Sequence, residues 1–106
     1  MKYNVVFLQI ALDDLEQIVT YVARDNTNAA LKLHDRIIET ASKLSEFPMM
    51  GRLVPDEKIG KHGFRMIGHG NYTLFYKVYE NNVVVLRVLH GARDYPNLLV
   101  PDEDTE

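Results

Sequence analysis

Four side chains in the C-terminal part of the sequence have types that suit chemistry on a phosphodiester. Arg65 and Arg93 could hold a phosphate, and His90 could move protons near neutral pH. Tyr95 could stack on a base or donate a proton. Metal-independent RNA cleavage needs such a set, because a base activates the 2′-hydroxyl, an acid protonates the leaving oxygen and a cation stabilises the added phosphate charge. These four residues are the candidate catalytic residues.

Three of the four candidates also have a purely structural interpretation. His90 would be hydrogen-bonded in a turn at a strand end, and Arg93 would form an ion pair with Asp94. Arg65 would be a solvated strand residue. His69, a second residue that could move protons, follows a glycine and is expected at the surface. Whether Arg65, His90 and Arg93 converge depends on strand register, since a slip of one residue turns every side chain to the other face.

The residue types exclude several other kinds of site. The chain has no cysteine, so it has no disulfide framework, thiolate metal site or thiol nucleophile. Its histidines and carboxylates do not occur at metal-ligand spacing, and it has no glycine-rich phosphate loop. No metal or cofactor is expected.

Charge is distributed unevenly along the chain. Residues 58–93 carry six basic side chains and one acidic side chain, whereas residues 11–46 carry seven acids and four bases. The last six residues include four acids and no base. A basic C-terminal half suits an anionic partner, either nucleic acid or an acidic peptide, although solvated strand faces would have the same composition.

The chain length and both ends of the sequence define the expected organisation. A chain of 106 residues forms one domain, expected over residues 1–99, with an acidic, disordered tail at 100–106. The apolar stretch near the N-terminus is too short to span a membrane, and no signal-peptide cleavage site follows it. A cytoplasmic protein without membrane contact is expected.

The periodicity of the apolar residues predicts a strand followed by two helices. Residues 3–8 are β-branched or aromatic and favour a strand. Apolar residues at helical spacing follow over 11–22 and 30–44, with Thr27 or Asn28 as the cap of the second helix. Asp13, Asp14 and Glu16 would lie near the first turn, where the helix dipole favours acids. The residue before Pro48 ends the second helix.

The second half of the sequence predicts a loop and three strands. Residues 49–63 contain one proline and three glycines and are expected to form a loop. Strands are predicted over 64–69, 72–79 and 83–90, separated by short turns. The predicted order is strand, helix, helix and three strands. The expected fold is therefore α+β, with a helical hairpin on one face of a small, mainly antiparallel sheet.

Four strings in this order resemble the RelE/ParE toxin superfamily. ALDDLEQIVTY at 11–21 is similar to the first helix of that family, and FPMMGR at 47–52 is similar to the end of its second helix. YTLFYKV at 72–78 resembles its middle strand. VLHGARD at 88–94 resembles the last strand and turn of its ParE-like and plasmid-stabilisation members. The likeness covers residues 3–99.

The resemblance implies a cytoplasmic toxin that is encoded beside an antitoxin, the protein that binds and silences it. ParE-like members of the family poison DNA gyrase, whereas RelE-like members cut messenger RNA on the ribosome. RelE-like nucleases typically carry arginine where this chain has Thr73, and they are usually strongly basic, whereas this chain has a pI near 5.8. These departures favour a ParE-like gyrase inhibitor. The alternatives are a RelE-like ribonuclease, with Arg65, His90, Arg93 and Tyr95 as catalytic residues, and a non-toxic relative that only binds its partner.

Overall fold

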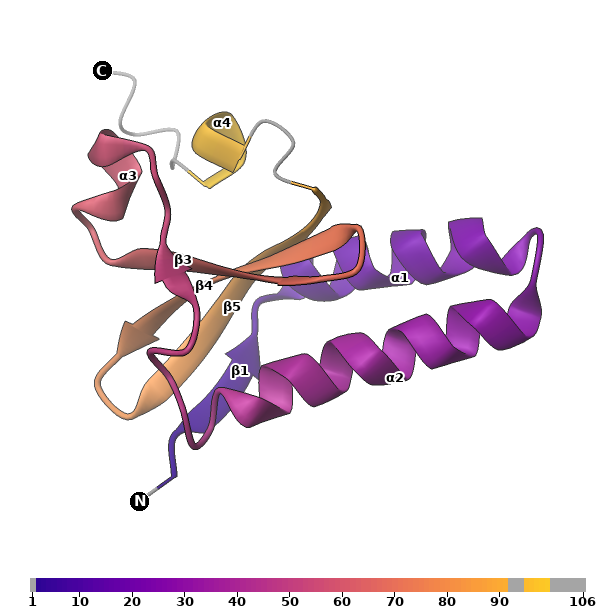
Figure 1. The fold of residues 1–106 in the computed structure, drawn as a ribbon, viewed down its shortest axis with the longest axis horizontal. Helices are drawn as coiled ribbons and strands as arrows, with labels where there is room; N and C mark the ends of the chain where they lie inside the picture. The colour runs from indigo at the N-terminus through magenta and orange to yellow at the C-terminus, as the bar shows by residue number, and fades with distance from the viewer. Residues whose placement is uncertain (1, 92–94, 100–106) are drawn as a thin grey trace.

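The structure is a computed structural model, and it describes residues 2–91 and 95–99. The predicted tail at 100–106 therefore lies outside the described residues. Within them the chain forms, in order, β1 (Asn4–Phe7), α1 (Gln9–Ala23), α2 (Thr27–Lys43), β2 (Arg52–Leu53), α3 (Glu57–Gly60), β3 (Phe64–His69), β4 (Tyr72–Tyr79), β5 (Asn82–His90) and α4 (Tyr95–Leu99). Figure 1 shows these elements along the chain.

The five strands form one mixed sheet in the order β1-β5-β4-β3-β2. The β1 strand pairs with β5 in parallel, and the other neighbours pair antiparallel. The predicted α+β fold, with its helical hairpin and mainly antiparallel sheet, is confirmed. None of the helices in the described ranges has the length and the apolar run that a bilayer-spanning helix needs.

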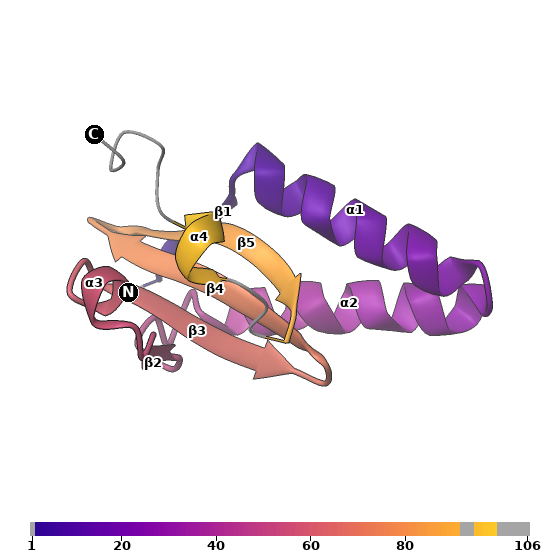
Figure 2. The ribbon, with the colours of Figure 1, turned by 90° about the horizontal axis from the view of Figure 1, so that it is seen from above.

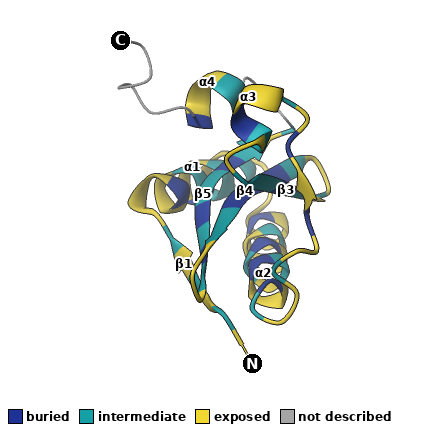
Figure 3. Cartoon of the chain, turned by 90° about the vertical axis from the view of Figure 1, so that its left-hand side faces the viewer, coloured by how far each residue is buried: buried dark blue, intermediate teal, exposed yellow. Residues whose placement is uncertain are grey.

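The helices α1 and α2 run side by side and cover one face of the sheet (Figures 1 and 3). Ala11 and Leu15 of α1 and Ile37 and Ala41 of α2 are buried against the sheet, as the apolar spacing predicts. The N-cap of α2 is Asn26 rather than Thr27 or Asn28, because its side chain accepts a hydrogen bond from the Ala29 N–H at 3.0 Å.

The helices α3 and α4 lie on the face of the sheet opposite the helical hairpin (Figures 2 and 3). A second apolar cluster lies between them and the sheet. Its buried residues are Val54, Ile59, Met66, Phe75 and Leu99. The prediction of an unbroken loop over 49–63 is wrong, since β2 and α3 lie within it. The four-residue α3 is too short to show helical periodicity, and it forms because the Asp56 carboxylate accepts hydrogen bonds from the N–H groups of Lys58 and Ile59.

A bulge in β5 decides which of its side chains face the helices. Phe75 lies opposite Arg87 and Tyr76 lies opposite Val85, so Leu86 is the extra residue. Before the bulge Val85 faces the helical hairpin, and after it Val88 does so. Leu86 packs instead against the cluster under α4. The bulge therefore reverses the alternation of the strand just where it meets α1.

Candidate functional site

Arg65, the predicted phosphate-binding residue on β3, is held by the backbone. Its Nη1 atom donates a hydrogen bond of 2.7 Å to the carbonyl oxygen of Gly51. The side chain is half-buried, and in the β3–β4 register it lies opposite Tyr76. Arg65 therefore supports the segment that leads from α2 to β2, a role that the sequence did not indicate.

Tyr95, which the sequence analysis predicts to stack on a base or donate a proton, holds α4 against the sheet. Its ring stacks on Phe75 with a centroid separation of 5.3 Å and an interplanar angle of 23°. Its hydroxyl oxygen accepts a hydrogen bond of 3.0 Å from the Asp56 N–H. Tyr95 therefore joins α4, α3 and β4, on the face of the sheet opposite the helical hairpin.

His90 lies exposed at the end of β5, opposite Tyr72 of β4. The two rings meet edge to face, with their centroids 5.3 Å apart. His69 of β3 lies opposite the other side of Tyr72, so the two histidines flank the tyrosine across three strands. His69, Tyr72 and His90 thus form a row at the end of the sheet where a turn joins β3 to β4.

The described candidates do not assemble into one site. Arg65 pairs with Tyr76 and His90 pairs with Tyr72, so they lie four residues apart along β4 and on strands either side of it. Strand geometry then separates their Cα atoms by roughly 16 Å. Tyr95 lies over the second cluster, and Arg93 is outside the described residues. Over residues 2–91 and 95–99, no group of three His, Cys, Asp or Glu residues could hold a metal ion.

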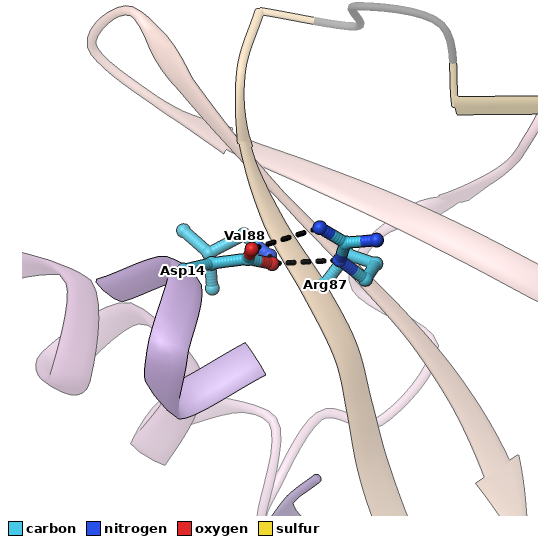
Figure 4. Close-up of polar contacts among 3 residues, drawn as sticks. All are labelled: Asp14, Arg87 and Val88. Atoms are coloured by element: carbon cyan, nitrogen blue, oxygen red, sulfur yellow. Dashed lines mark hydrogen bonds and ion pairs between the residues drawn. The ribbon is translucent and has the colours of Figure 1, made fainter. Parts of the chain in front are cut away.

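An ion pair between α1 and β5 is the strongest polar contact that the sequence analysis missed (Figure 4). Nε and Nη2 of Arg87 each donate a 2.8 Å hydrogen bond to the Asp14 carboxylate, which also accepts one of 3.0 Å from the Val88 N–H. The two side chains are only 11% (Asp14) and 16% (Arg87) exposed. The hydrogen bonds to Asp14 raise the pKa of Arg87 further above its ordinary range.

The expected dipole role of Asp14 is wrong, since α1 begins at Gln9 and has no acid in its first turn. Two features of the sequence could have marked each partner as buried, although neither feature pairs them. Asp14 follows Ala11 by three residues and precedes Ile18 by four, which places it on the inward stripe of the helix. Arg87 interrupts the apolar run of β5, where an unpaired cation would be unfavourable.

Tyr76 is the buried polar centre of the segment after α2. Its hydroxyl donates a 2.8 Å hydrogen bond to the Pro48 carbonyl oxygen and accepts one of 2.8 Å from the Gly51 N–H. Burial raises the pKa of Tyr76 above its ordinary value of 10.0, although the Gly51 hydrogen bond and the charge of Arg65 act in the opposite direction. The neutral hydroxyl is therefore the form that the fold requires.

The raised pKa predicts that wild-type stability falls in alkaline solution. Because the folded-state pKa of Tyr76 exceeds the unfolded-state pKa, its stabilisation is complete below the unfolded-state pKa and is lost as pH rises through the folded-state pKa. Urea unfolding between about pH 8 and about pH 11 should show that the free energy of unfolding falls more steeply with pH for wild type than for Tyr76→Phe. The exposed Tyr79, changed to Phe, is the matched control and should follow wild type. Equal dependence of the free energy of unfolding on pH in wild type and Tyr76→Phe would contradict a raised pKa of Tyr76.

The fold is a small, mainly antiparallel sheet backed by an N-terminal helical hairpin. A family described as the ParE toxin of the type II toxin–antitoxin system, parDE, matches residues 5–95. The chain belongs to this family of type II toxin–antitoxin toxins.

The solved structures that are similar to this one include two from toxin–antitoxin systems. A chain of the toxin–antitoxin complex RelBE2 from Mycobacterium tuberculosis has a TM-score of 0.65 and 26% identity, with 85% of this chain and 99% of that chain covered. A chain of the chromosomal ParDE system from P. aeruginosa has a TM-score of 0.69 and 20% identity, covering 85% of this chain and 97% of that chain. The second likeness shows the fold alone. Among curated proteins, none matches the chain.

Proposed function

We propose that this toxin acts in the cytoplasm, where it inhibits DNA gyrase by binding rather than by catalysis and is silenced by its antitoxin. The observation that carries the proposal is the dispersal of the candidate catalytic residues. Arg65 and His90 lie on strands either side of β4 and at different heights along it, and the side chains of Arg65 and Tyr95 are engaged in structural hydrogen bonds. The match to the ParE family supports the same target.

The experiment is a gyrase assay with purified toxin, alongside pulse-labelling of cells after the toxin is induced without antitoxin. Supercoiling by gyrase should fall as toxin is added, and thymidine incorporation should fall before methionine incorporation. Untouched supercoiling together with an early stop in methionine incorporation would replace the proposal with the RelE-like one, in which messenger RNA on the ribosome is the target. Unimpaired growth would indicate a non-toxic relative that only binds its partner.

A substitution at His90 separates the binding proposal from the catalytic one. His90 is exposed, and its ring forms a T-shaped contact with the ring of Tyr72, so His90→Ala should fold normally. Under the binding proposal the variant retains toxicity, whereas loss of a general acid or base would lower a cleavage rate by about 100-fold or more. Growth after induction and the supercoiling assay both measure this. A folded His90→Ala protein that no longer stops growth would contradict the proposal.

A further inference from the structure

The short helix α3 presents two lysines on the face of the sheet opposite the helical hairpin. Its inner side is anchored by Ile59, which is buried in the second apolar cluster. Lys58 lies within the helix and Lys61 is its C-cap residue, and both are exposed. The Asp56 carboxylate accepts hydrogen bonds from the N–H groups of Lys58 and Ile59, so the backbone beneath both lysines is fixed by a capped turn.

Two further cations lie on the same face, on the strands either side of β3. Lys77 of β4 lies opposite Phe64, and its Nζ atom is 5.2 Å from the centre of the Phe64 ring. Arg52 of β2 is exposed and lies opposite Met66, a residue of the second cluster. Lys77 and Arg52 are two strands apart across the sheet and two residues apart along β3, which separates their Cα atoms by roughly 12 Å. Together with the two lysines of α3 they are called here the cationic surface.

Over residues 2–91 and 95–99, the cations of this surface take no part in an ion pair with a carboxylate. Residues 52–77 carry five bases and two acids, which are Asp56 and Glu57. Residues 9–43, which include both helices of the hairpin, carry six acids and four bases. The segment that builds α3 and the neighbouring strands is therefore basic, whereas the helical hairpin is acidic, and an anionic partner is attracted to the first and repelled by the second.

In residues 52–77, all of which the structure describes, the exposed large apolar side chain is Leu53, at 48%. Leu53 lies opposite Arg65, and Arg65 lies opposite Tyr76, which is buried in the core under the hairpin. Leu53 is therefore on the hairpin side of the sheet and does not join the cationic surface. Protein interfaces usually have an apolar core, whereas arginine and lysine side chains contact phosphates without one. The surface therefore fits a phosphodiester backbone better than an acidic protein.

We propose that the cationic surface binds the backbone of the duplex DNA on which gyrase acts, so that the toxin contacts gyrase and DNA together. The chain has a net charge of −3, so the surface alone should have weak affinity for free DNA. DNA that is already held by gyrase is present at a high effective concentration, and the contact then adds to the affinity of the toxin for gyrase. The inference rests on the proposed gyrase inhibition and adds a second partner to it.

The test measures the affinity of fluorescently labelled toxin for gyrase by anisotropy, with and without a short duplex bound to the gyrase. Bound duplex should raise the affinity of wild type by about tenfold or more. Lys58→Glu/Lys61→Glu should remove most of this gain and lower the slope of log affinity against log salt concentration by about two. Its affinity for gyrase alone should equal that of wild type. Its unfolding midpoint should stay near that of wild type, because both side chains are exposed.

Lys32→Glu/Arg36→Glu is the matched control, because it makes the same change in charge at two exposed residues of α2. This control should keep the gain from bound duplex within about twofold of the wild-type gain. An equal loss in the control would overturn the proposal, since total charge rather than the cationic surface would then carry the effect.

Three other outcomes are also decisive. If wild type binds gyrase equally well with and without duplex, or if the α3 variant keeps the full gain, the DNA contact is overturned and gyrase inhibition stands. If wild type binds free single-stranded RNA more tightly than free duplex and the α3 variant loses that binding, the surface is assigned to RNA instead. If wild type does not bind gyrase in either state, the proposed gyrase inhibition itself fails.

Discussion

Asp14→Ala is expected to lower the free energy of unfolding by about 3–5 kcal/mol, the largest loss from a single substitution considered for this chain. The alanine leaves the Arg87 guanidinium, with only 16% of its side chain exposed, without its partner. It also removes the acceptor of the Val88 N–H. Unfolding in urea, followed by circular dichroism, measures the loss. Small domains have about 5–15 kcal/mol in total, so this loss is a large fraction of the free energy of unfolding.

Asp13→Ala is the matched control for this substitution. Asp13 is exposed and its carboxylate accepts one hydrogen bond from the Gln9 side chain, so its loss should leave the unfolding midpoint nearly unchanged. Asp14→Leu combined with Arg87→Met should recover part of the stability, because no buried charge remains, while the Val88 N–H still lacks its acceptor. If Asp14→Ala were as stable as Asp13→Ala, the ion pair would not hold α1 to β5.

Gly51→Ala is expected to lower the free energy of unfolding by about 2–4 kcal/mol, because the added methyl group overpacks the site and the Tyr76 hydrogen bonds are lost. The added Cβ would lie 2.7 Å from both the Met66 carbonyl oxygen and the Tyr76 hydroxyl. The carbonyl belongs to the backbone of β3 and cannot move aside cheaply, so the loop must shift and break its bonds to Tyr76. The same urea experiment measures the cost.

Gly68→Ala provides the comparison, because Gly68 lies on the same strand as Met66. A Cβ there would meet only the Tyr72 carbonyl oxygen, at an ordinary contact distance of 3.7 Å. Gly68→Ala should therefore be neutral or slightly stabilising, since alanine reduces the freedom of the unfolded chain. Equal stability of the two alanine variants would show that the segment between α2 and β2 is not fixed by close approach to Tyr76.

The sequence by itself determined the local elements and the family. The helices α1 and α2 follow from apolar residues at three- and four-residue spacing, and β4 follows from its β-branched and aromatic residues between Tyr72 and Tyr79. The helical pattern reflects burial on one side of each helix, so it can be read without knowing what covers that side. The short α3 and α4 could not be predicted in this way, since one turn has no periodicity.

Only the tertiary structure decided which distant side chains meet. Arg65, His90 and Tyr95 all lie in the second half of the sequence. In the fold, Arg65 and His90 lie on different strands and at different positions along β4, and Tyr95 packs against the second cluster. Asp14 and Arg87 are 73 residues apart and bond directly. Both results depend on strand register and on the extra residue Leu86 in β5, which reverses the alternation of its side chains. Register is set by the packing of the whole domain, so no local pattern in the sequence contains it.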